Sequence, residues 1–532
     1  MRIAAGAGIA LAMVVGAVPA SGQTGGTDLA PGGTFFDDDG NPHEGAIEAL
    51  AAAGITRGCG EEDLFCPSRD VTRGQFAAFL VRALSLPRSE ADPFTDDGDS
   101  IFEAEIASLE AAGITRGCGP EVFCPVRPVT RGELAAFLVR ALGLEHAQGH
   151  SFADAEGSIF ERDIAALAEA GITRGCNPPD NDRYCPGKAV SRDEMASFLA
   201  RALGLRFREV PPRPEVRMAF TGDLLIHLPV SRRAAGYGSP YDFRPMFAPV
   251  APWLEAADLA ICHLEVPLSR HNRDLSGYPT FNAPRQVADA VADAGYDGCS
   301  TASNHSYDQG EAGIASTLEV LEEAGLDQAG MATGPEDAGR ATFYRTESAT
   351  VAHLSATWWL NGLRLPPGKP WLVQMLEVDG LLSQAEAARR EGADVVVVSV
   401  HCCTEYRTAP TDYQREVARR LIASPHVDLV VGHHAHVVQP VEEVDGEYIV
   451  YGLGNFLSAQ RSRPSTQDGV IVEVEMALRG EGWAARELRA YPTWVEGGSY
   501  RILPAARHNA ASWERTERAL RGEGVDGLTV VR

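Results

Sequence analysis

The pattern of apolar and polar positions divides the chain near residue 206. Up to that point, alanine-rich stretches place apolar residues at helical spacing, as in VTRGQFAAFLVRAL, where Phe76, Phe79 and Leu80 share one face. Beyond it, β-branched runs such as VRMAF, DLAIC, ADVVVVSV and VDLVV alternate with helical stretches. Runs that are apolar throughout are typical of strands buried on both faces. We therefore predict a helix-rich first part and an α/β second part in which helices cover the sheet.

The helix-rich part contains three copies of one unit, which we place at 35–89, 90–147 and 148–205. The sequence GITRGC marks each copy with a period of 58 or 59 residues, and each copy starts with a Phe-x-Asp triplet. The copies begin at Phe36, Phe94 and Phe152, and the predicted capping boxes are Thr72 with Gln75, Thr130 with Glu133, and Ser191 with Glu194. One such helix cannot bury its own apolar stripe, so we expect the three copies to share a core.

Six of the ten cysteines form three close pairs, one after each GITRGC marker. Because each pair closes a small loop beside the same landmark, we predict the disulfides Cys59–Cys66, Cys118–Cys124 and Cys176–Cys185. The alternative of three metal knuckles lacks the four ligands that zinc requires.

An arginine stands just inside the start of each predicted capped helix, at Arg73, Arg131 and Arg192. The helix dipole disfavours a cation at this position. A cation that occurs there three times suggests an anionic partner. The alternative is that the three arginines are solvated and that helix capping offsets their unfavourable interaction with the dipole.

The three copies resemble the S-layer homology (SLH) repeat, through a Thr/Ser-Arg-x-Glu/Gln signature that recurs within residues 35–205. This resemblance implies a helix-rich pseudo-threefold unit that binds anionic secondary cell wall polymer through Arg73, Arg131 and Arg192. Gln75 replaces the signature glutamate in the first copy, which puts that copy's groove in doubt.

The first residues of the sequence and its net charge suit an exported protein. Arg2 and the apolar run AAGAGIALAMVVGAVPA predict a signal peptide at 1–20, cleaved after Ala20, and a linker at 21–34. The run is shorter than the roughly 20 residues of a transmembrane anchor, although a retained N-terminal anchor is the alternative. The net charge of −26 argues against nucleic acid as a partner and suits an extracellular protein that carries divalent cations.

The remaining boundaries follow from composition. RFREVPPRPE, residues 206–215, is a proline-rich, extended linker. Residues 216–505 then form one domain, and residues 506–532 a C-terminal tail with a short helix.

Side chains of metal-ligand type follow the apolar runs of the second part. These are Asp223, His263 and Glu265, Asn304 and His305, His401, the histidines of GHHAH at His433, His434 and His436, and Asn455. Taken one at a time, these residues have ordinary explanations. An Asp or Asn after a strand usually forms a turn, and a single His is more often a structural residue than a metal ligand. Together they predict one site, because the carboxyl ends of strands in α/β sheets converge.

The ligand types narrow the chemistry of this site. No pair of close-spaced cysteines accompanies them, which disfavours structural zinc. Carboxylate, carboxamide and imidazole ligands together suit Mn, Fe or Zn with positions open for water. Six or more ligands are too many for one ion, so we predict two divalent metal ions about 3.5–4 Å apart.

The motifs GD, HLE, SNH, His401, HHAH and GLGNF, in this order, resemble the CapA family of capsule and poly-γ-glutamate synthesis proteins over residues 216–480. The resemblance implies an α/β layered sandwich of the calcineurin-like metallophosphoesterase type. It also implies the metal ligands Asp223, Glu265, Asn304, His401, His434 and His436, with Asp223 and His305 as catalytic groups. Since residues i and i+2 of an extended segment point the same way, we predict that His433 points elsewhere.

Two departures from the family pattern leave alternatives open. His263 stands where the family has Asn, as an extra ligand or as a hydrogen-bond donor, and we favour the donor. Cys402 and Cys403 after His401 could form a disulfide, bind metal or remain buried thiols, and we favour thiols. His227 could be a further ligand, and the sequence assigns no role to Cys262 and Cys299.

The favoured hypothesis is a secreted protein attached to the cell wall that acts in capsule, poly-γ-glutamate or envelope polymer biosynthesis. Its partners would be the wall polymer and the capsule machinery. One alternative is a non-catalytic surface protein that binds or anchors polymer. Another is a secreted metal-dependent phosphodiesterase unrelated to capsule.

Overall fold

The computed structural model describes residues 29, 31–60, 63–146, 152–178, 180–480, 482–525 and 527–532. The predicted signal peptide at 1–20 and residues 21–28 of the predicted linker lie outside these ranges. The chain forms two compact units that divide between Arg213 and Pro214. Among the described residues, no helix is both long enough and apolar enough to cross a membrane.

Unit 1 is a closed ring of three helix pairs. The second helix of each repeat packs against the first helix of the next repeat, and the third repeat closes back onto the first. The pairs in contact are α2 (Arg73–Leu84) with α3 (Glu103–Ala111), α4 (Arg131–Leu142) with α5 (Glu161–Glu169), and α6 (Arg192–Ala202) with α1 (Glu44–Ala52). One apolar core joins all three repeats, as predicted.

Three buried valines tie the ring together at its centre. The backbone N–H of Val129 donates to Val71 O at 2.9 Å, that of Val190 to Val129 O at 3.0 Å, and that of Val71 to Val190 O at 2.9 Å. Each repeat thus donates one bond and accepts one, which is the pseudo-threefold arrangement that the sequence predicts.

The repeat starts differ in register from the prediction. Phe35, not Phe36, matches Phe94 and Phe152, because its ring packs on Phe65 as Phe94 packs on Phe123 and Phe152 on Tyr184. In each repeat the aspartate two residues later accepts two backbone N–H bonds from the cysteine loop, as Asp37 does from Phe65 and Cys66 at 2.7 Å.

Two of the three predicted capping boxes form, those of Thr72 with Gln75 and of Thr130 with Glu133. In the third repeat Ser191 makes no cap hydrogen bond to the helix and donates instead to the Asp193 carboxylate. The competing carboxylate two residues on explains why the third prediction is wrong.

All ten cysteines are paired. The three predicted disulfides of unit 1 are present. Cys262 and Cys299 stand opposite each other on neighbouring strands and are bonded. Cys402 is bonded to Cys403, so the prediction of free thiols is wrong. This pair follows the end of a strand, where the turning chain brings the two adjacent side chains together.

Unit 2 is built on two facing sheets. The described part of the larger sheet has nine strands, in the order β16–β15–β14–β1–β2–β5–β6, with β13 beside β1 and β17 beside β15. Its strands are β1 (Glu215–Leu225), β2 (Leu259–Leu264), β5 (Gly298–Ser300), β6 (Asp327–Ala329), β13 (Asn455–Ser458), β14 (Asp468–Arg479), β15 (Gly482–Val495), β16 (Ile502–Pro504) and β17 (Leu528–Val530).

The smaller sheet has the order β11–β12–β10–β9–β8–β7. Its strands are β7 (Thr342–Arg345), β8 (Thr350–Thr357), β9 (Val395–His401), β10 (Leu429–His433), β11 (Val441–Val444) and β12 (Glu447–Val450). A separate two-stranded pair joins β3 (Leu268–Ser269) to β4 (Ala283–Pro284). The four apolar runs named from the sequence form β1, β2, β9 and β10, so their prediction as buried strands is confirmed.

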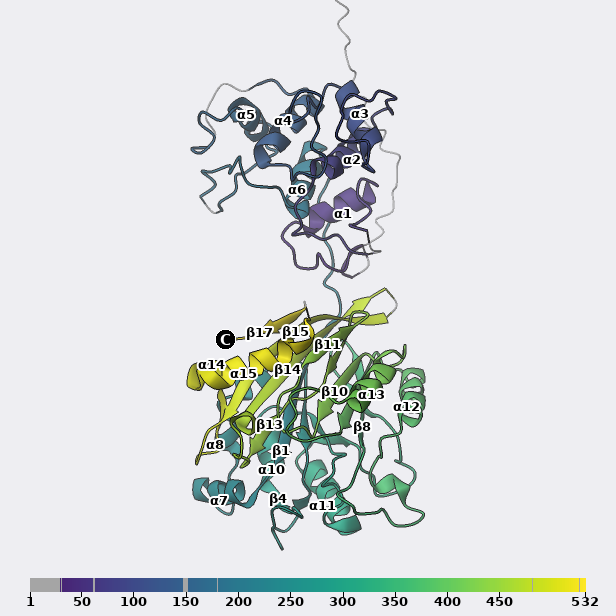
Figure 1. Cartoon of the computed structure of the whole chain (residues 1–532), viewed down its shortest axis with the longest axis vertical. Helices are drawn as coiled ribbons and strands as arrows, with labels where there is room; N and C mark the ends of the chain where they lie inside the picture. The colour runs from purple at the N-terminus through teal and green to yellow at the C-terminus, as the bar shows by residue number, and fades with distance from the viewer. Residues whose placement is uncertain are drawn as a thin grey trace, which may run out of the picture. The chain divides into compact units, whose positions relative to one another are not determined.

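Alternating residues of these strands face two different cores. Met218 of β1 packs with Val397 of β9 between the sheets, whereas Ala219 and Val396 face outward to the helices. The larger sheet is covered by α7 (Leu228–Tyr237), α8 (Arg244–Phe247), α9 (Ala251–Leu254), α10 (Gln286–Asp293) and α11 (Gly310–Glu323). The smaller sheet is covered by α12 (Val378–Arg390) and α13 (Asp412–Ile422), which lie outside β8 and β10 in Figure 1. The predicted α/β layered sandwich is confirmed as helix, sheet, sheet, helix.

The last residues belong to this sandwich and are not a separate tail. α14 (Ala505–His508) leads into α15 (Ala510–Leu520), which packs on β14 and β15, and β17 pairs with β15. The Arg515 guanidinium donates two bonds to Asp468 at 2.8 and 2.9 Å. The apolar face of the amphipathic helix α15 is buried against strands β14 and β15.

Candidate metal centre

Strands from both sheets bring seven ionisable side chains together in unit 2. Within each of three groups, ligand atoms lie within 4.8 Å of one another, and all members are buried. The groups are Asp223, His263 and His433; Glu265, His401 and His434; and Asp223, Glu265 and His436. Five of the six predicted metal ligands are therefore neighbours, and Asn304 contacts the second group through His401.

Asp223 lies inside β1, where the strand changes register against both β2 and β13. Such an irregularity turns a side chain away from the regular pleat. The turn needs glycine beside it, because a Cβ at Gly222 would lie 2.0 Å from Gly454 O. The glycine before Asp223 is therefore part of how the sequence aims this carboxylate.

The HHAH segment is turned, not extended. His434 and His436 have φ angles of 83° and 54°, in the left-handed region that side chains rarely adopt. Such backbone costs of the order of 1–3 kcal/mol per residue and is found mainly at functional sites. Both side chains reach the cluster because of this turn, and the extended geometry assumed from the sequence is wrong.

His433 also joins the cluster, so the prediction that it points elsewhere is wrong. Its ring stacks on His263 with centroids 4.0 Å apart and planes 12° apart. Its Nδ1 lies 3.6 Å from Asp223 Oδ1. As the last residue of β10 it faces the gap between the sheets, whereas the two following histidines arrive by the turn.

Glu265 is completely buried, and its carboxylate is approached by imidazoles that lie beyond hydrogen-bond distance. Neither carboxylate oxygen has a hydrogen-bond partner among the described residues. The nearest imidazole nitrogens are His436 Nε2 at 3.7 Å and His401 Nε2 at 3.9 Å. Burial raises the pKa of Glu265 well above its ordinary value. A buried carboxylate without donors is costly, and a bound cation would remove that cost.

Asp223 is the better supported of the two acids. His436 Nδ1 lies 2.9 Å from Asp223 Oδ2. Burial acts to raise the pKa of Asp223, but the nearby imidazoles of His433 and His436 hold it well below its usual range. Burial acts to lower the pKa of His436, yet Glu265 and Asp223 raise it to about 9. Asp223 and His436 thus form a charged pair.

His401 is held by a chain of hydrogen bonds. His263 Nε2 lies 2.8 Å from His401 Nδ1, and His263 Nδ1 lies 2.8 Å from Ser300 Oγ. His401 Nε2 faces Asn304 Oδ1 at 2.8 Å. His263 therefore acts as a hydrogen-bond partner, as favoured from sequence, and it is also close enough to Asp223 to be a ligand.

Two of the histidines are neutral in this environment. Burial lowers the pKa of His401 well below its ordinary value and that of His434 to about 3. His434 Nδ1 has no hydrogen-bond partner in the described part of the chain. Neutral imidazole is the form that binds metal ions.

His305 lies outside the three groups and is held by residues that the sequence did not single out. Its Nδ1 is 2.7 Å from Asp308 Oδ2 and 3.4 Å from the Asn361 amide, and its ring packs on Phe281. The signal for Asp308 was its position three residues after His305 in SNHSYD.

Two further residues border the cluster. His227 is in none of the three groups, and its Nδ1 lies 2.9 Å from Leu225 O. Asn455 pairs with Asp223 across β1 and β13, and its buried Oδ1 has no partner among the described residues. Asn455 stands out in the sequence after a strand but was assigned no role there.

The side chains present suit divalent metal ions. Two carboxylates, several neutral imidazoles and an amide are the mixture typical of Mn, Fe and Zn sites. Glu265 and Asp223 each belong to two of the three groups, so one acid can be shared between neighbouring ions.

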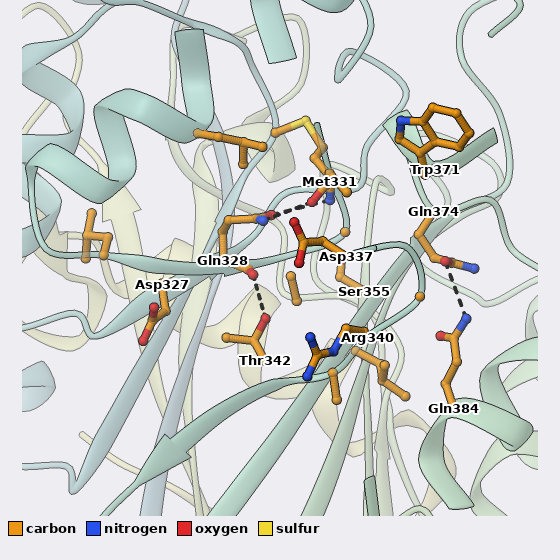
Figure 2. A pocket seen from close by; sticks show the side chains of 18 of the residues that line it. Asp327, Gln328, Met331, Asp337, Arg340, Thr342, Ser355, Trp371, Gln374 and Gln384 are labelled. Atoms are coloured by element: carbon orange, nitrogen blue, oxygen red, sulfur yellow. Dashed lines mark hydrogen bonds between the residues drawn. The ribbon is translucent and has the colours of Figure 1, made fainter. Parts of the chain in front are cut away.

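A separate cavity of about 520 Å³ opens at the edges of the two sheets, beside β6 and β7. Figure 2 shows Asp337, Arg340, Trp371 and Gln374 around it. None of the seven clustered residues lines this cavity, so it is not the entrance to the candidate metal centre.

In unit 1 the three signature arginines are buried, which excludes the alternative of solvated side chains. Arg131 Nε donates to Tyr184 O at 2.8 Å and its Nη2 to Gly175 O at 3.0 Å. The guanidinium lies between the rings of Tyr184 and Phe198, 4.8 and 5.0 Å from their centroids. Each arginine leaves its own helix and enters the next repeat, away from the dipole that would disfavour it.

The carboxylate partners differ between repeats. Arg73 pairs with Glu133 at 3.2 Å and Arg131 with Glu194 at 3.7 Å. Arg192 meets the repeat that carries Gln75 in place of glutamate, and burial lowers the pKa of Arg192 to about 10. The departure noted in the first repeat thus changes the surroundings of the third arginine.

Comparison with known proteins agrees with both units. Residues 217–460 match the family "Bacterial capsule synthesis protein PGA_cap", and residues 37–77 match the S-layer homology domain. The chain is 28% identical over 300 residues to the capsule biosynthesis protein CapA of Bacillus anthracis, which covers 55% of this chain and 70% of that protein. It is 29% identical over 176 residues to the S-layer protein EA1 of the same species, which covers 32% of this chain and 20% of that protein.

Among solved structures, the chain is similar to the calcineurin-like phosphoesterase YfkN from Bacillus subtilis. The TM-score is 0.36 with 11% identity, over 57% of this chain and 100% of that one. The chain thus combines a segment that matches the S-layer homology domain, at residues 37–77, with a segment that matches the bacterial capsule synthesis protein PGA_cap, at residues 217–460.

Proposed function

We propose that unit 2 is a metal-dependent hydrolase of the metallophosphoesterase type with a dinuclear centre. The observation that carries this proposal is Glu265, a fully buried carboxylate that accepts no hydrogen bond from the described residues and lies among imidazoles and a second carboxylate. A fold that leaves such a charge unpaired is destabilised unless a cation binds.

The residues divide into two ligand sets that share Glu265. Asp223 and His436 complete one set, and His401, His434 and the Asn304 amide oxygen complete the other. Bound there, divalent ions would supply Lewis acidity and a water that ionises near neutral pH. The mixed donors favour Mn, Fe or Zn.

The remaining side chains would position the reacting groups. Asp308 fixes the His305 ring through its Nδ1, which leaves Nε2 to deliver a proton to a leaving oxygen. His263 and Ser300 fix the His401 ring, as supporting partners commonly do for metal-binding histidines.

We further propose that unit 1 attaches the chain to the cell wall through anionic wall polymer, and that unit 2 acts on capsule, poly-γ-glutamate or envelope polymer. The similarity to CapA and to S-layer proteins supports this role. Arg73, Arg131 and Arg192 remain the proposed polymer-binding residues, although their burial gives them a structural task as well.

The hydrolase proposal is tested with the full-length chain, loaded with Mn, Fe or Zn and assayed on phosphodiester and γ-glutamyl substrates. We expect turnover that a chelator abolishes and that Asp223→Ala reduces at least about 100-fold. The exposed Asp274 provides a matched control, Asp274→Ala, which should retain full activity. No turnover of either substrate class with any of the three metals would contradict the proposal.

Attachment is tested by retention of the full-length chain on purified cell wall. Soluble anionic wall polymer should compete for the chain, and a chelator of transition metals should not release it. A chain that passes through without retention would contradict the attachment role while leaving the hydrolase proposal untouched.

A further inference from the structure

The loop before α1 contains a second buried carboxylate without a partner. Asp38 is 0% exposed, and neither of its oxygens has a hydrogen-bond partner among the described residues. The helix that follows starts with another acid, Glu44. A buried carboxylate without donors destabilises a fold in general, so the surroundings of Asp38 need an explanation.

Two further carboxylates stand beside Asp38. Asp39 and Glu44 each place a carboxylate oxygen within 4.8 Å of Asp38 and of each other. Arg213 Nε donates to Asp39 at 2.6 Å, and the Gly40 N–H donates to Glu44 at 3.2 Å. These contacts hold the two neighbours in place and bring no donor to Asp38.

The negative charges reinforce one another. Burial is the main cause that raises the pKa of Asp38 to about 8, and Glu48, Glu44 and Asp39 raise it further. Glu48 is not available as a partner, because the N–H and hydroxyl of Thr34 each donate to its carboxylate at 2.7 Å.

The other two repeats show that the fold does not need this carboxylate. The same position holds Asp97 in the second repeat, where both oxygens again lack partners, and Ala155 in the third. All three residues are buried. Since a methyl group fills the site in the third repeat, the acid in the first repeat is not required for packing.

We propose that Asp38, Asp39 and Glu44 bind a calcium ion in the first repeat. The three ligands are all carboxylate oxygens, which suit a hard cation and not a transition metal. Calcium accepts irregular geometry with water in its remaining positions, whereas magnesium demands a near-ideal octahedron. Three carboxylates, of which Asp39 and Glu44 are partly exposed, indicate an affinity in the range of extracellular calcium modules, about 10⁻⁴–10⁻³ M.

The test compares calcium responses of the full-length chain after removal of metal with a chelator. We expect calorimetric titration with CaCl₂ to detect one site that Asp38→Asn removes. We also expect 10 mM CaCl₂ to raise the melting temperature of unit 1 by about 3–5 °C in the unsubstituted chain, and not in Asp38→Asn. Asparagine has the shape of aspartate without its charge, so this variant isolates the charge.

Two controls make the result specific. Glu156→Gln changes the exposed acid beside Ala155 in the third repeat and should keep the full calcium response. Asp38→Ala reproduces the residue that the third repeat tolerates, and should fold and lose the response if Asp38→Asn folds poorly. Both substitutions lie outside the candidate metal centre, so the outcome of the calcium test does not depend on the hydrolase proposal.

Equal calcium responses in the unsubstituted chain and in Asp38→Asn would overturn the proposal, as would no response at 10 mM. An equal temperature rise with MgCl₂ would overturn the assignment to calcium.

Discussion

Two buried charged side chains, one in each unit, have opposite surroundings. Arg131 in unit 1 is buried, but its guanidinium has two carbonyl acceptors, two aromatic rings and a nearby carboxylate. Glu265 in unit 2 is equally buried and has no donor at all among the described residues.

This difference separates structural charges from binding groups. Where a charge stabilises the fold, the chain itself supplies the partners, as the next repeat does for Arg131. Where a buried carboxylate receives no hydrogen bond and lies among six other ionisable side chains, we infer that the missing partner is a ligand. The same reasoning applies to Asp38, so the comparison can be tested in both units.

The largest effect should come from removing the unpaired charge, in the variant Glu265→Gln. Because both ligand sets share this carboxylate, we expect metal affinity to fall at least about a thousand-fold, or about 4 kcal/mol. The metal-free variant should be more stable than the metal-free parent, since a costly charge is gone. Denaturant unfolding with and without chelator measures both effects.

Truncating the fully partnered charge should destabilise the fold. Arg131→Ala removes the donor of the buried Tyr184 carbonyl and of the partly buried Gly175 carbonyl, and it removes packing between two rings, so we expect a loss of about 3 kcal/mol from unit 1. Thermal or denaturant unfolding of the full-length chain measures this loss. The exposed Arg57 offers the control Arg57→Ala, expected to change stability by less than about 0.5 kcal/mol. Equal effects of the two substitutions would contradict the structural role of Arg131.

A smaller effect is expected from His263→Asn, which removes the partner of His401 Nδ1. If His263 only orients His401, zinc affinity measured by chelator competition should fall about ten-fold. A fall of a thousand-fold or more would show instead that His263 is itself a ligand.

The smallest effect concerns a half-buried acid, Glu447 of β12, which belongs to none of the carboxylate and histidine groups described above. Burial is the main cause that raises the pKa of Glu447 to about 8, and one of its oxygens lacks a partner among the described residues. The folded state binds the Glu447 proton more tightly than the unfolded state does. The contribution of this proton to the free energy of unfolding is therefore fully present below about pH 4.5 and is lost as the pH rises towards 8. Glu447→Gln should therefore gain about 1 kcal/mol at pH 8 and nothing at pH 4.5, in urea unfolding at both pH values. An equal gain in stability at pH 4.5 and at pH 8 would contradict the raised pKa of Glu447.

Much of the candidate site could be predicted because strand periodicity reveals where strands end. The runs before His263, His401 and His433 are almost entirely apolar, so the polar residues that follow them mark an end of the sheet. The CapA resemblance then assigned ligand roles to Asp223, Glu265 and His401, which the structure brings together.

What could not be predicted depends on backbone turns and on contacts distant in sequence. The left-handed residues His434 and His436 are invisible in the sequence, and so is the stacking of His433 on His263. The carbonyl that accepts the Arg131 hydrogen bond belongs to Tyr184, 53 residues away in the next repeat. A local helix-dipole argument therefore detected an unusual arginine but not its partners.

The most direct test is the metal content of the purified full-length chain, measured by mass spectrometry of the elements. Our account predicts two ions of Mn, Fe or Zn per chain, and none in Glu265→Gln. A folded parent chain that holds no divalent transition metal, even after incubation with all three, would contradict it.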